Sequence, residues 1–426
     1  MNIVKNFHIF IFCLSLILVS ACKDNSKTNN NSRASSEEKT QIVQILENPV
    51  VGNSALPRLF SNGSELFLSW VETRDTLAVL NYSAFNTGTW TPPETVVSGA
   101  DWFVNWADFP AIAENNGNIL TNILQKSADD TYTYDVKLNL FTAKDTSWNK
   151  DFILHDDKTK SEHGFVSMRP YVANTFMVTW LDGRETVGNS HGETHEDGHG
   201  NGQMTLRGAL VFEDGSIQYD TLLDDRVCDC CNTSTAIGTN DVILVAYRDR
   251  SEKEIRDVSV VRWEQETGWS QPKNIGNDNW EIPGCPVNGP SIDTYDDGAA
   301  IAWFTAKNDK PKVQIVFSDD NGLTFGLPIR VDSNDTSGRV DVAMISKGSA
   351  LVCWMENIDE TTVIKAIKIN SNGSKGEAVV VATTSPERAS GFPQMEVMGN
   401  KAFFAWTDVD GKSKLVKTAF VVLSNL

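Results

Sequence analysis

The sequence predicts an all-β fold built from a repeat of four strands. No stretch after residue 40 shows helical periodicity, whereas a short apolar run ending in a large residue recurs seven times. The runs are Leu66–Trp70, Leu120–Leu124, Phe176–Trp180, Ile243–Tyr247, Ala299–Trp303, Ala350–Trp354 and Ala402–Trp406. Four antiparallel strands per repeat, arranged radially, describe the blades of a β-propeller. We therefore expect a seven-bladed β-propeller, with six blades as the alternative if one repeat is not a true blade.

Each repeat supplies further strands around its apolar run. A preceding strand is often opened by a proline, at Pro57, Pro110, Pro170, Pro290 and Pro393. A third and usually a fourth strand follow, as at Lys312–Phe317 and Leu327–Val331. The last repeat ends after its third strand, Lys414–Leu423, so we expect Gln41–Leu46 to supply its outer strand and close the ring.

One turn carries a sharper signature. Ser318–Phe325 fits the Asp box, a turn of the form Ser-x-Asp-x-Gly-x-Thr-aromatic. In such a turn the aspartate accepts hydrogen bonds from backbone amides, glycine permits a positive φ, and the aromatic ring packs beneath. Asp320 and Gly322 occupy these positions. The Asp box stabilises a turn and supports the fold, and it gives no information on catalysis.

The N-terminal region predicts export and lipid attachment. Met1–Ala21 has an early positive residue, an apolar run too short to span a bilayer, and a Val-Ser-Ala sequence directly before Cys22. This resembles the bacterial lipobox, whose cysteine is acylated; an ordinary secretory signal is the alternative. Residues 22–40 predict a flexible tether, which leaves 41–426 for the propeller. We expect an outer-membrane lipoprotein of the cell envelope, surface-exposed or periplasmic, anchored to the membrane through Cys22.

The formal net charge of −19 at pH 7 restricts the partners. A field of this sign repels nucleic acid and anionic membrane surfaces, and it is compatible with cations and neutral sugars. An anionic ligand would need a local cluster of arginines. We expect a monomer that binds a glycan or a metal ion and no nucleic acid.

Antiparallel order places several functional residue types on one side of the disc. In each blade the loop between the second and third strands and the connection to the next blade emerge together, on what we call the front face. The remaining turns, including the Asp box, emerge on the back face. The front segments are expected to be 157–168, 182–203, 225–231, 248–256 and 280–290. Because they carry histidines, arginines and cysteines, we predict a ligand site at this mouth of the channel.

Four cysteines fall in these front segments. Cys353 lies in an apolar run and is expected to be a buried core thiol. The four cysteines of the front segments are Cys228, Cys230, Cys231 and Cys285. Disulfides are favoured in an oxidising compartment, and a thiolate site for a soft metal is the alternative.

Segment 182–203 contains a histidine-rich insert. His191, His195 and His199 are four residues apart among glycines and acidic residues. Imidazole and carboxylate ligands suit zinc or copper. A solvated insert of biased composition is the alternative.

Charged residues follow two of the apolar runs on the front face. They are Asp182 and Arg184 after one run, and Arg248, Asp249, Arg250 and Arg256 after the run that ends in Tyr247. Arginine forks bind carboxylates bidentately, as recognition of an acidic sugar requires. A network of ion pairs that holds the loops is the alternative.

Five segments together resemble a known family. They are Glu162–Ser167, Cys228–Cys231, Tyr247–Arg250, Gly284–Pro290 and Gly338–Asp341. With the Asp box and the lipobox, they resemble bacterial sialidase-like (BNR/Asp-box) β-propeller lipoproteins, in a subgroup often labelled exo-α-sialidase. Family sialidases use an arginine triad; alignment on Pro57 places Ala55 at the first triad position.

The resemblance implies that the propeller binds or cleaves carbohydrate, acidic glycans among them. A sialidase-type hydrolase and a polysaccharide lyase are the two enzyme classes considered. The lyase comparison assigns His163, Tyr247 and Arg248 as acid, base and neutralising group. The full candidate catalytic set is His163, Asp182, Arg184, Tyr247, Arg248 and Asp249, with Arg250, Arg256 and Asn288 as binding residues. Copper or zinc binding, or a non-catalytic disc that binds a partner, are the alternative functions.

Overall fold

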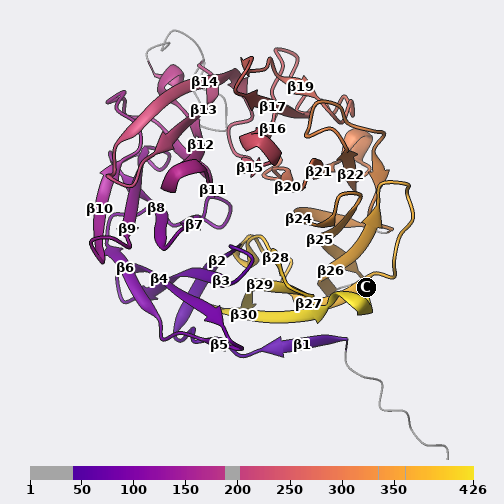
Figure 1. Cartoon of the computed structure of the whole chain (residues 1–426), viewed down its shortest axis with the longest axis horizontal. Coiled ribbons are helices and arrows are strands. Elements are labelled where there is room, and N and C mark those ends of the chain that lie inside the picture. The colour runs from indigo at the N-terminus through magenta and orange to yellow at the C-terminus, as the bar shows by residue number, and fades with distance from the viewer. Residues whose placement is uncertain (1–41, 188–201, 334, 360) are drawn as a thin grey trace, which may run out of the picture. The chain divides into compact units, whose positions relative to one another are not determined.

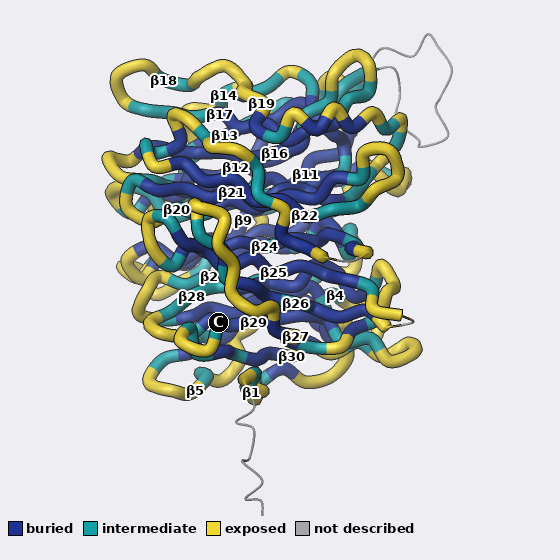
Figure 2. Tube along the Cα trace, turned by 90° about the vertical axis from the view of Figure 1, so that its right-hand side faces the viewer, coloured by how far each residue is buried: buried dark blue, intermediate teal, exposed yellow. Residues whose placement is uncertain are grey.

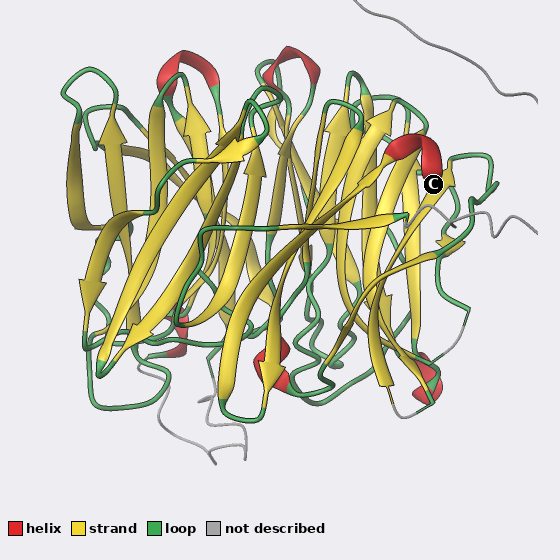
Figure 3. Ribbon diagram, turned by 90° about the horizontal axis from the view of Figure 1, so that it is seen from below, coloured by secondary structure: helices red, strands yellow, loops and turns green. Residues whose placement is uncertain are grey.

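Seven antiparallel sheets follow one another around a common axis, each forming one blade (Figure 1). The computed structural model describes residues 42–187, 202–333, 335–359 and 361–426. The seven-bladed β-propeller predicted from the repeat is therefore confirmed, and the six-bladed alternative is wrong. Strands run between two layers of loops, which are the front and back faces (Figure 3).

The first three blades occupy residues 53–227. Blade 1 contains β2 (Asn53–Ser61), β3 (Leu66–Arg74), β4 (Leu77–Asn86), β5 (Thr89–Trp90) and β6 (Glu94–Gly99). Blade 2 contains β7 (Ile112–Asn115), β8 (Asn118–Lys126), β9 (Tyr134–Thr142) and β10 (Ser147–Ile153). Blade 3 contains β11 (His163–Pro170), β12 (Phe176–Asp182), β13 (Met204–Val211) and β14 (Ile217–Val227).

The remaining four blades complete the ring. Blade 4 contains β15 (Ser234–Ile237), β16 (Ile243–Arg248), β17 (Val258–Glu264), β18 (Gly268–Trp269) and β19 (Lys273–Asn274). Blade 5 contains β20 (Ser291–Tyr295), β21 (Gly298–Thr305), β22 (Lys312–Ser318) and β23 (Ile329–Arg330). Blade 6 contains β24 (Thr336–Ser346), β25 (Ser349–Ile358), β26 (Thr361–Asn370) and β27 (Val379–Thr384). Blade 7 contains β28 (Gln394–Met398), β29 (Lys401–Asp410), β30 (Ser413–Val422) and β1 (Val43–Leu46).

The N-terminal strand closes the ring as predicted. β1 pairs antiparallel with β30, with Val43 opposite Val421 and Leu46 opposite Thr418. Blade 7 is thus built from both ends of the domain. This pairing covers the outer edge that β30 would otherwise expose.

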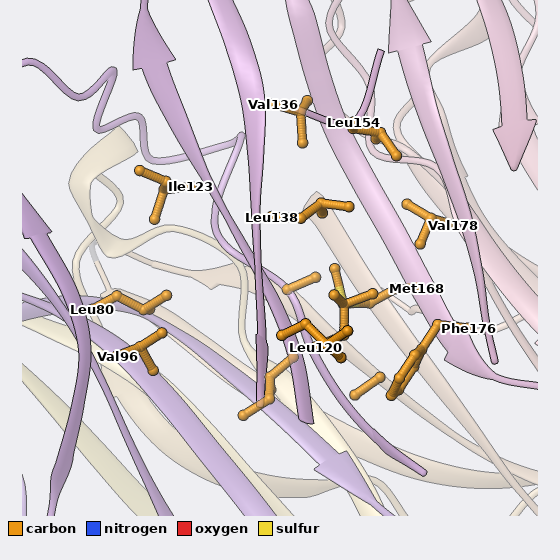
Figure 4. Packing of buried hydrophobic residues seen from close by; sticks show 14 of the residues in the cluster. Leu80, Val96, Leu120, Ile123, Val136, Leu138, Leu154, Met168, Phe176 and Val178 are labelled. Carbon is orange, nitrogen blue, oxygen red and sulfur yellow. The ribbon is translucent and has the colours of Figure 1, made fainter. Parts of the chain in front are cut away.

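The core lies between neighbouring blades. The second strand of each blade is buried on both faces, which is why the repeat appears in the sequence as a continuous apolar run instead of an alternating one (Figure 2). Trp70, Trp180, Trp303 and Trp354 at the ends of these strands are almost fully buried. Figure 4 shows this packing across blades 1 to 3. Cys353 on β25 is fully buried, as expected of a core thiol.

The Asp box forms the predicted turn between β22 and β23. Asp320 accepts hydrogen bonds from the backbone N–H and the hydroxyl of Thr324, and the Ser318 hydroxyl accepts one from the Gly322 N–H. Gly322 has φ of +77°, and a Cβ there would lie 2.5 Å from a Leu244 side-chain carbon.

Among the described residues no helix is long and apolar enough to cross a membrane.

Candidate functional site

The structure brings two cysteine segments together on the front face. Cys228, Cys230 and Cys231 directly follow β14, and their sulfur atoms all lie within 4.8 Å of one another. Sγ of Cys228 lies 3.1 Å from that of Cys231 and 4.0 Å from that of Cys230. Cys285, in the connection between β19 and β20, contacts Cys230 from the solvent side. We call these four residues the thiol cluster.

Arginines surround the buried side of the thiol cluster. Arg256 donates from Nη1 to Sγ of Cys228 at 3.4 Å, and the Cys228 backbone N–H donates to the Arg248 carbonyl at 3.0 Å. Burial alone would raise the pKa of the Cys228 thiol. Hydrogen bonds from Cys230 and Cys231 and the charge of Arg256 outweigh it, so the pKa lies well below the usual range. Cys228 is therefore the thiol most readily ionised.

Arg248 does not present a free guanidinium to a ligand. Its side chain is 2% exposed and donates hydrogen bonds to the backbone carbonyls of Asn288, Arg256 and Phe304. The ring of Trp280 stacks against it at 5.2 Å. Arg248 thus ties its own loop to the segment 280–290 and to β21 through neutral carbonyls, and not through the ion pairs given above as the alternative.

The segment Gly284–Pro290 is fixed by its own residues. The Asn288 carbonyl accepts from Arg248, and its side-chain oxygen accepts from the Arg339 N–H at 2.6 Å. Gly289 lies against the backbone of Asn232, where an added Cβ would be 2.1 Å from the carbonyl oxygen. The glycine therefore permits the close approach that sets Cys285 beside the other cysteines.

The other predicted arginines form an ion-pair network around the same loops. Arg250 contacts Asp229 and Glu254, and Arg256 contacts the same two carboxylates. Tyr247 is fully buried and donates its hydroxyl to Asp224. Burial and then the charge of Asp224 raise the pKa of Asp249 to about 6; the carboxylate accepts from the Ser259 hydroxyl.

A second cluster contains His163 and a histidine that sequence analysis missed. The rings of His155 and His163 stack with centroids 3.6 Å apart, and one oxygen of Asp157 lies 3.0 and 3.1 Å from their nitrogens. Burial, followed by the charge of His163, lowers the pKa of His155 to about 4. Burial opposes ionisation of His163 as well, but the hydrogen bond with Asp157 and the charge of Asp182 raise its pKa above the usual value.

Asp182 and Arg184 close this histidine cluster. Arg184 Nε and Nη2 each lie 2.7 Å from an oxygen of Asp182, and Nη2 lies 3.2 Å from Asp157. Asp182 also accepts from the indole of Trp180. The signal that could have found His155 is its position just after β10 and two residues before the front segment 157–168. His191, His195 and His199 lie outside the described residues.

A third buried group also escaped sequence analysis. The Tyr134 hydroxyl donates to Glu162 at 2.6 Å and lies 3.3 Å from Asp108, and Phe103 stacks on the tyrosine ring. Burial raises the pKa of Asp108 to about 8, with the charge of Glu162 contributing in the same direction. Tyr134 is fully buried and Asp108 is 2% exposed, so these groups hold the connections on both sides of blade 2 to β9.

A sizeable cavity lies elsewhere, at the back mouth of the channel. Its volume is about 640 Å³, and its lining comes from the inner strands and back turns of six blades, all except blade 6. At its centre Arg169 of β11 and Glu396 of β28 are 3.7 Å apart, with roughly a fifth of each side chain exposed. Burial raises the pKa of Glu396 to about 8, although Arg169 opposes the shift. Ser61, Ser64 and Thr294 add hydroxyl groups to the wall.

Comparisons with known proteins were made at the level of sequence and of structure. No protein-family model matches the chain, and no curated protein sequence matches it. A Dyadobacter fermentans protein of unknown function is 12% identical with a TM-score of 0.48, over 89% of this chain and 97% of that one. The polysaccharide lyase Uly1 is 10% identical with a TM-score of 0.48, over 93% and 96%.

An α-L-arabinanase from Penicillium chrysogenum, complexed with arabinobiose, is 10% identical with a TM-score of 0.44, over 90% of this chain and 97% of that one. The last two of these three proteins are carbohydrate-active enzymes. The structural similarities are weak, so the functional inference depends on this chain's own residues.

Proposed function

We propose that this protein is an exported, lipid-anchored propeller that binds carbohydrate in the cavity at the back mouth of its channel. The observation that carries the proposal is the cavity of about 640 Å³ around the Arg169–Glu396 pair. This volume lies within the range of small-molecule sites, about 300–1,000 Å³. A large concave site with convergent polar groups and a shifted pKa is where ligand binding is expected first.

The lining suits a polyhydroxylated ligand. Sugar hydroxyls both donate and accept hydrogen bonds, and the wall offers hydroxyls, a guanidinium and a carboxyl group. Pro170, which is partly exposed, adds apolar surface against which the C–H face of a sugar ring can lie. The negative net charge of the chain favours a neutral or cationic sugar over an acidic one. The proposed site thus lies on the back face, whereas the sequence pattern placed it on the front.

Glu396 gives the site a neutral acid at pH 7. With a pKa of about 8 it carries a proton, which it can donate to a sugar oxygen. Cleavage of a glycosidic bond in this cavity would use Glu396 as the general acid, with Asp293 as the neighbouring carboxyl group. Product analysis therefore accompanies the binding screen.

The test is a glycan array followed by calorimetry on the mature chain. Arg169→Ala is expected to weaken binding of the selected glycan by ~10-fold or more, since a hydrogen bond to a charged group contributes ~1.5–3 kcal/mol. Arg207→Ala is the matched control, because Arg207 is paired with Asp220 on the outer strands of blade 3. Equal binding by both variants would contradict the proposal.

Anchoring is tested separately. We propose that Cys22 carries lipid and holds the domain to the outer membrane. Cys22→Ser is expected to move the protein from the membrane fraction to the soluble fraction and to abolish incorporation of a labelled fatty acid. Unchanged fractionation would contradict the anchor and leave the carbohydrate proposal intact.

A further inference from the structure

We propose a second site, in which the thiol cluster binds one thiophilic d¹⁰ cation, Zn²⁺ or Cu⁺. This site lies on the front face and does not depend on the carbohydrate proposal. The ligands are Cys228, Cys230 and Cys231, with Cys285 available as a fourth ligand from the solvent side.

The positions of the sulfur atoms fit metal ligation better than cross-linking. Sulfurs bound at about 2.3 Å around a tetrahedral zinc ion are about 3.8 Å apart, whereas a disulfide holds them at about 2.05 Å. The Cys228–Cys230 separation of 4.0 Å matches the first case, and the Cys228–Cys231 separation of 3.1 Å would widen slightly on binding. Three sulfurs around one point also provide the trigonal geometry available to Cu⁺ with soft ligands.

Charge around the cluster provides an independent argument. Arg248 is buried, and in the described part of the chain no carboxylate lies within ion-pair distance of it; its hydrogen bonds go to neutral carbonyls. Arg256 is 1% exposed and pairs with Asp229 and Glu254, but its Nε has no hydrogen-bond partner among the described residues. Buried cations without anionic partners are costly. A metal bound by three or four thiolates is anionic overall and would supply the negative charge that Arg248 lacks.

The site is held from behind and open in front. Gly289 packs on Asn232. Arg248 donates from its side chain to the Asn288 carbonyl and accepts at its own carbonyl from the Cys228 N–H, so both cysteine segments are fixed relative to each other. Cys285 is exposed and Cys230 is partly exposed, whereas Cys228 and Cys231 are buried. A cation therefore has an entry path past Cys285 to preplaced ligands.

The experiment measures metal binding to the full chain isolated without oxidation. We expect elemental analysis to give one equivalent of zinc or copper, and Co²⁺ added to the metal-free protein to give the intense thiolate-to-metal absorption of a tetrahedral sulfur site. Binding of Cu⁺ is measured in a competition titration with a Cu⁺ chelator. Cys228→Ser and Cys231→Ser are expected to lose the bound equivalent, and Cys353→Ala, a lone thiol on β25, is expected to retain it.

Cys285→Ser keeps the proposal testable if a buried variant fails to fold, because Cys285 is exposed. Zinc affinity is expected to fall by ~10-fold or more, whereas three-coordinate Cu⁺ binding is retained. Arg169→Ala, which tests the channel cavity, leaves the metal content unchanged. A Cys228–Cys231 disulfide in protein from the native envelope, or fully reduced thiols that bind neither cation, overturns the proposal.

Discussion

At the scale of single residues, buried charge decides what the front face can do. Arg248 and Arg256 were candidates for binding an acidic sugar, yet the structure surrounds them with backbone carbonyls, carboxylates and a thiol. The donors of Arg248 are used in this way, and Arg256 is 1% exposed, so neither guanidinium faces a substrate. These residues are therefore best understood as supports of the cysteine loops.

Arg248→Ala is expected to lower the free energy of unfolding by ~3–5 kcal/mol, because three buried carbonyls lose their donor. Lysine at this position should restore only part of the loss, since a single ammonium cannot match the planar fork. Denaturant unfolding checks this result. The exposed Lys253→Ala is the control, and equal stability of both alanine variants would refute the assignment.

Glu396 makes a pH dependence of ligand binding testable. Its pKa of about 8 exceeds the ordinary value of 4.5, so the folded protein holds this proton between these two values and loses it as the pH rises through about 8. The contribution of this proton to stability and any hydrogen bond that it donates to a sugar are both lost in that direction. The charged groups that act on it are Arg58, Arg169, Asp293 and Asp341.

Glycan affinity is therefore expected to fall when the pH is raised from 7 to 9 in calorimetric titrations. Glu396→Gln, which imitates the neutral acid, should bind with little change over the same range. A decline of the same size in the variant would show that another group titrates.

At the scale of elements, the segment Gly284–Pro290 works as a brace between blades. Two of its residues make these contacts. Asn288 accepts hydrogen bonds from Arg248 and Arg339, and Gly289 packs against Asn232. The first glycine of the segment has open space around it. The two glycines therefore have different roles, although the sequence presents them alike.

Gly289→Ala is expected to destabilise the protein by ~1–3 kcal/mol, because the added carbon meets backbone at 2.1 Å and the loops must separate. Gly284→Ala, with nothing within 4 Å of its Cβ position, should be near neutral. Thermal melts of both variants make the comparison. If Gly289→Ala behaves like Gly284→Ala, the two loops are not held in contact as described.

At the scale of the whole molecule, closure depends on one short strand. β1 supplies the outer strand of blade 7, and without it the length of β30 would be an unpaired edge. Ring closure also keeps β28 in line with the other inner strands, and this places Glu396 across the channel from Arg169.

A chain that begins at Asn48 is expected to melt ~5–10 °C below one that begins at Gln41, and to self-associate through the exposed edge. Calorimetry and light scattering test the two effects. Identical melting temperatures for the two chains would mean that β1 does not stabilise the ring.

The sequence by itself determined the repeat, the seven blades, the closing strand and the side on which each loop emerges. These follow from local signals: apolar runs at a regular spacing, turn residues, and the alternation of antiparallel strands. The same alternation correctly joined Cys285 to the segment 228–231. His155 and Asp157, which the sequence pattern did not single out, lie in a loop without a recognisable motif. Their role is apparent only from the residues that pack against them.

Only the tertiary structure decided which polar side chains are sealed inside and which face open space. Arg169 and Glu396 lie on inner strands more than 200 positions apart and carry no motif, yet they meet in the cavity at the back mouth of the channel. Arg248 stands in a conspicuous motif, yet it is buried. Whether a side chain is buried, and which groups it pairs with, depends on contacts between segments that are distant in the sequence. Both factors change the chemistry of the side chain. A motif alone therefore cannot distinguish a ligand-binding group from a structural one.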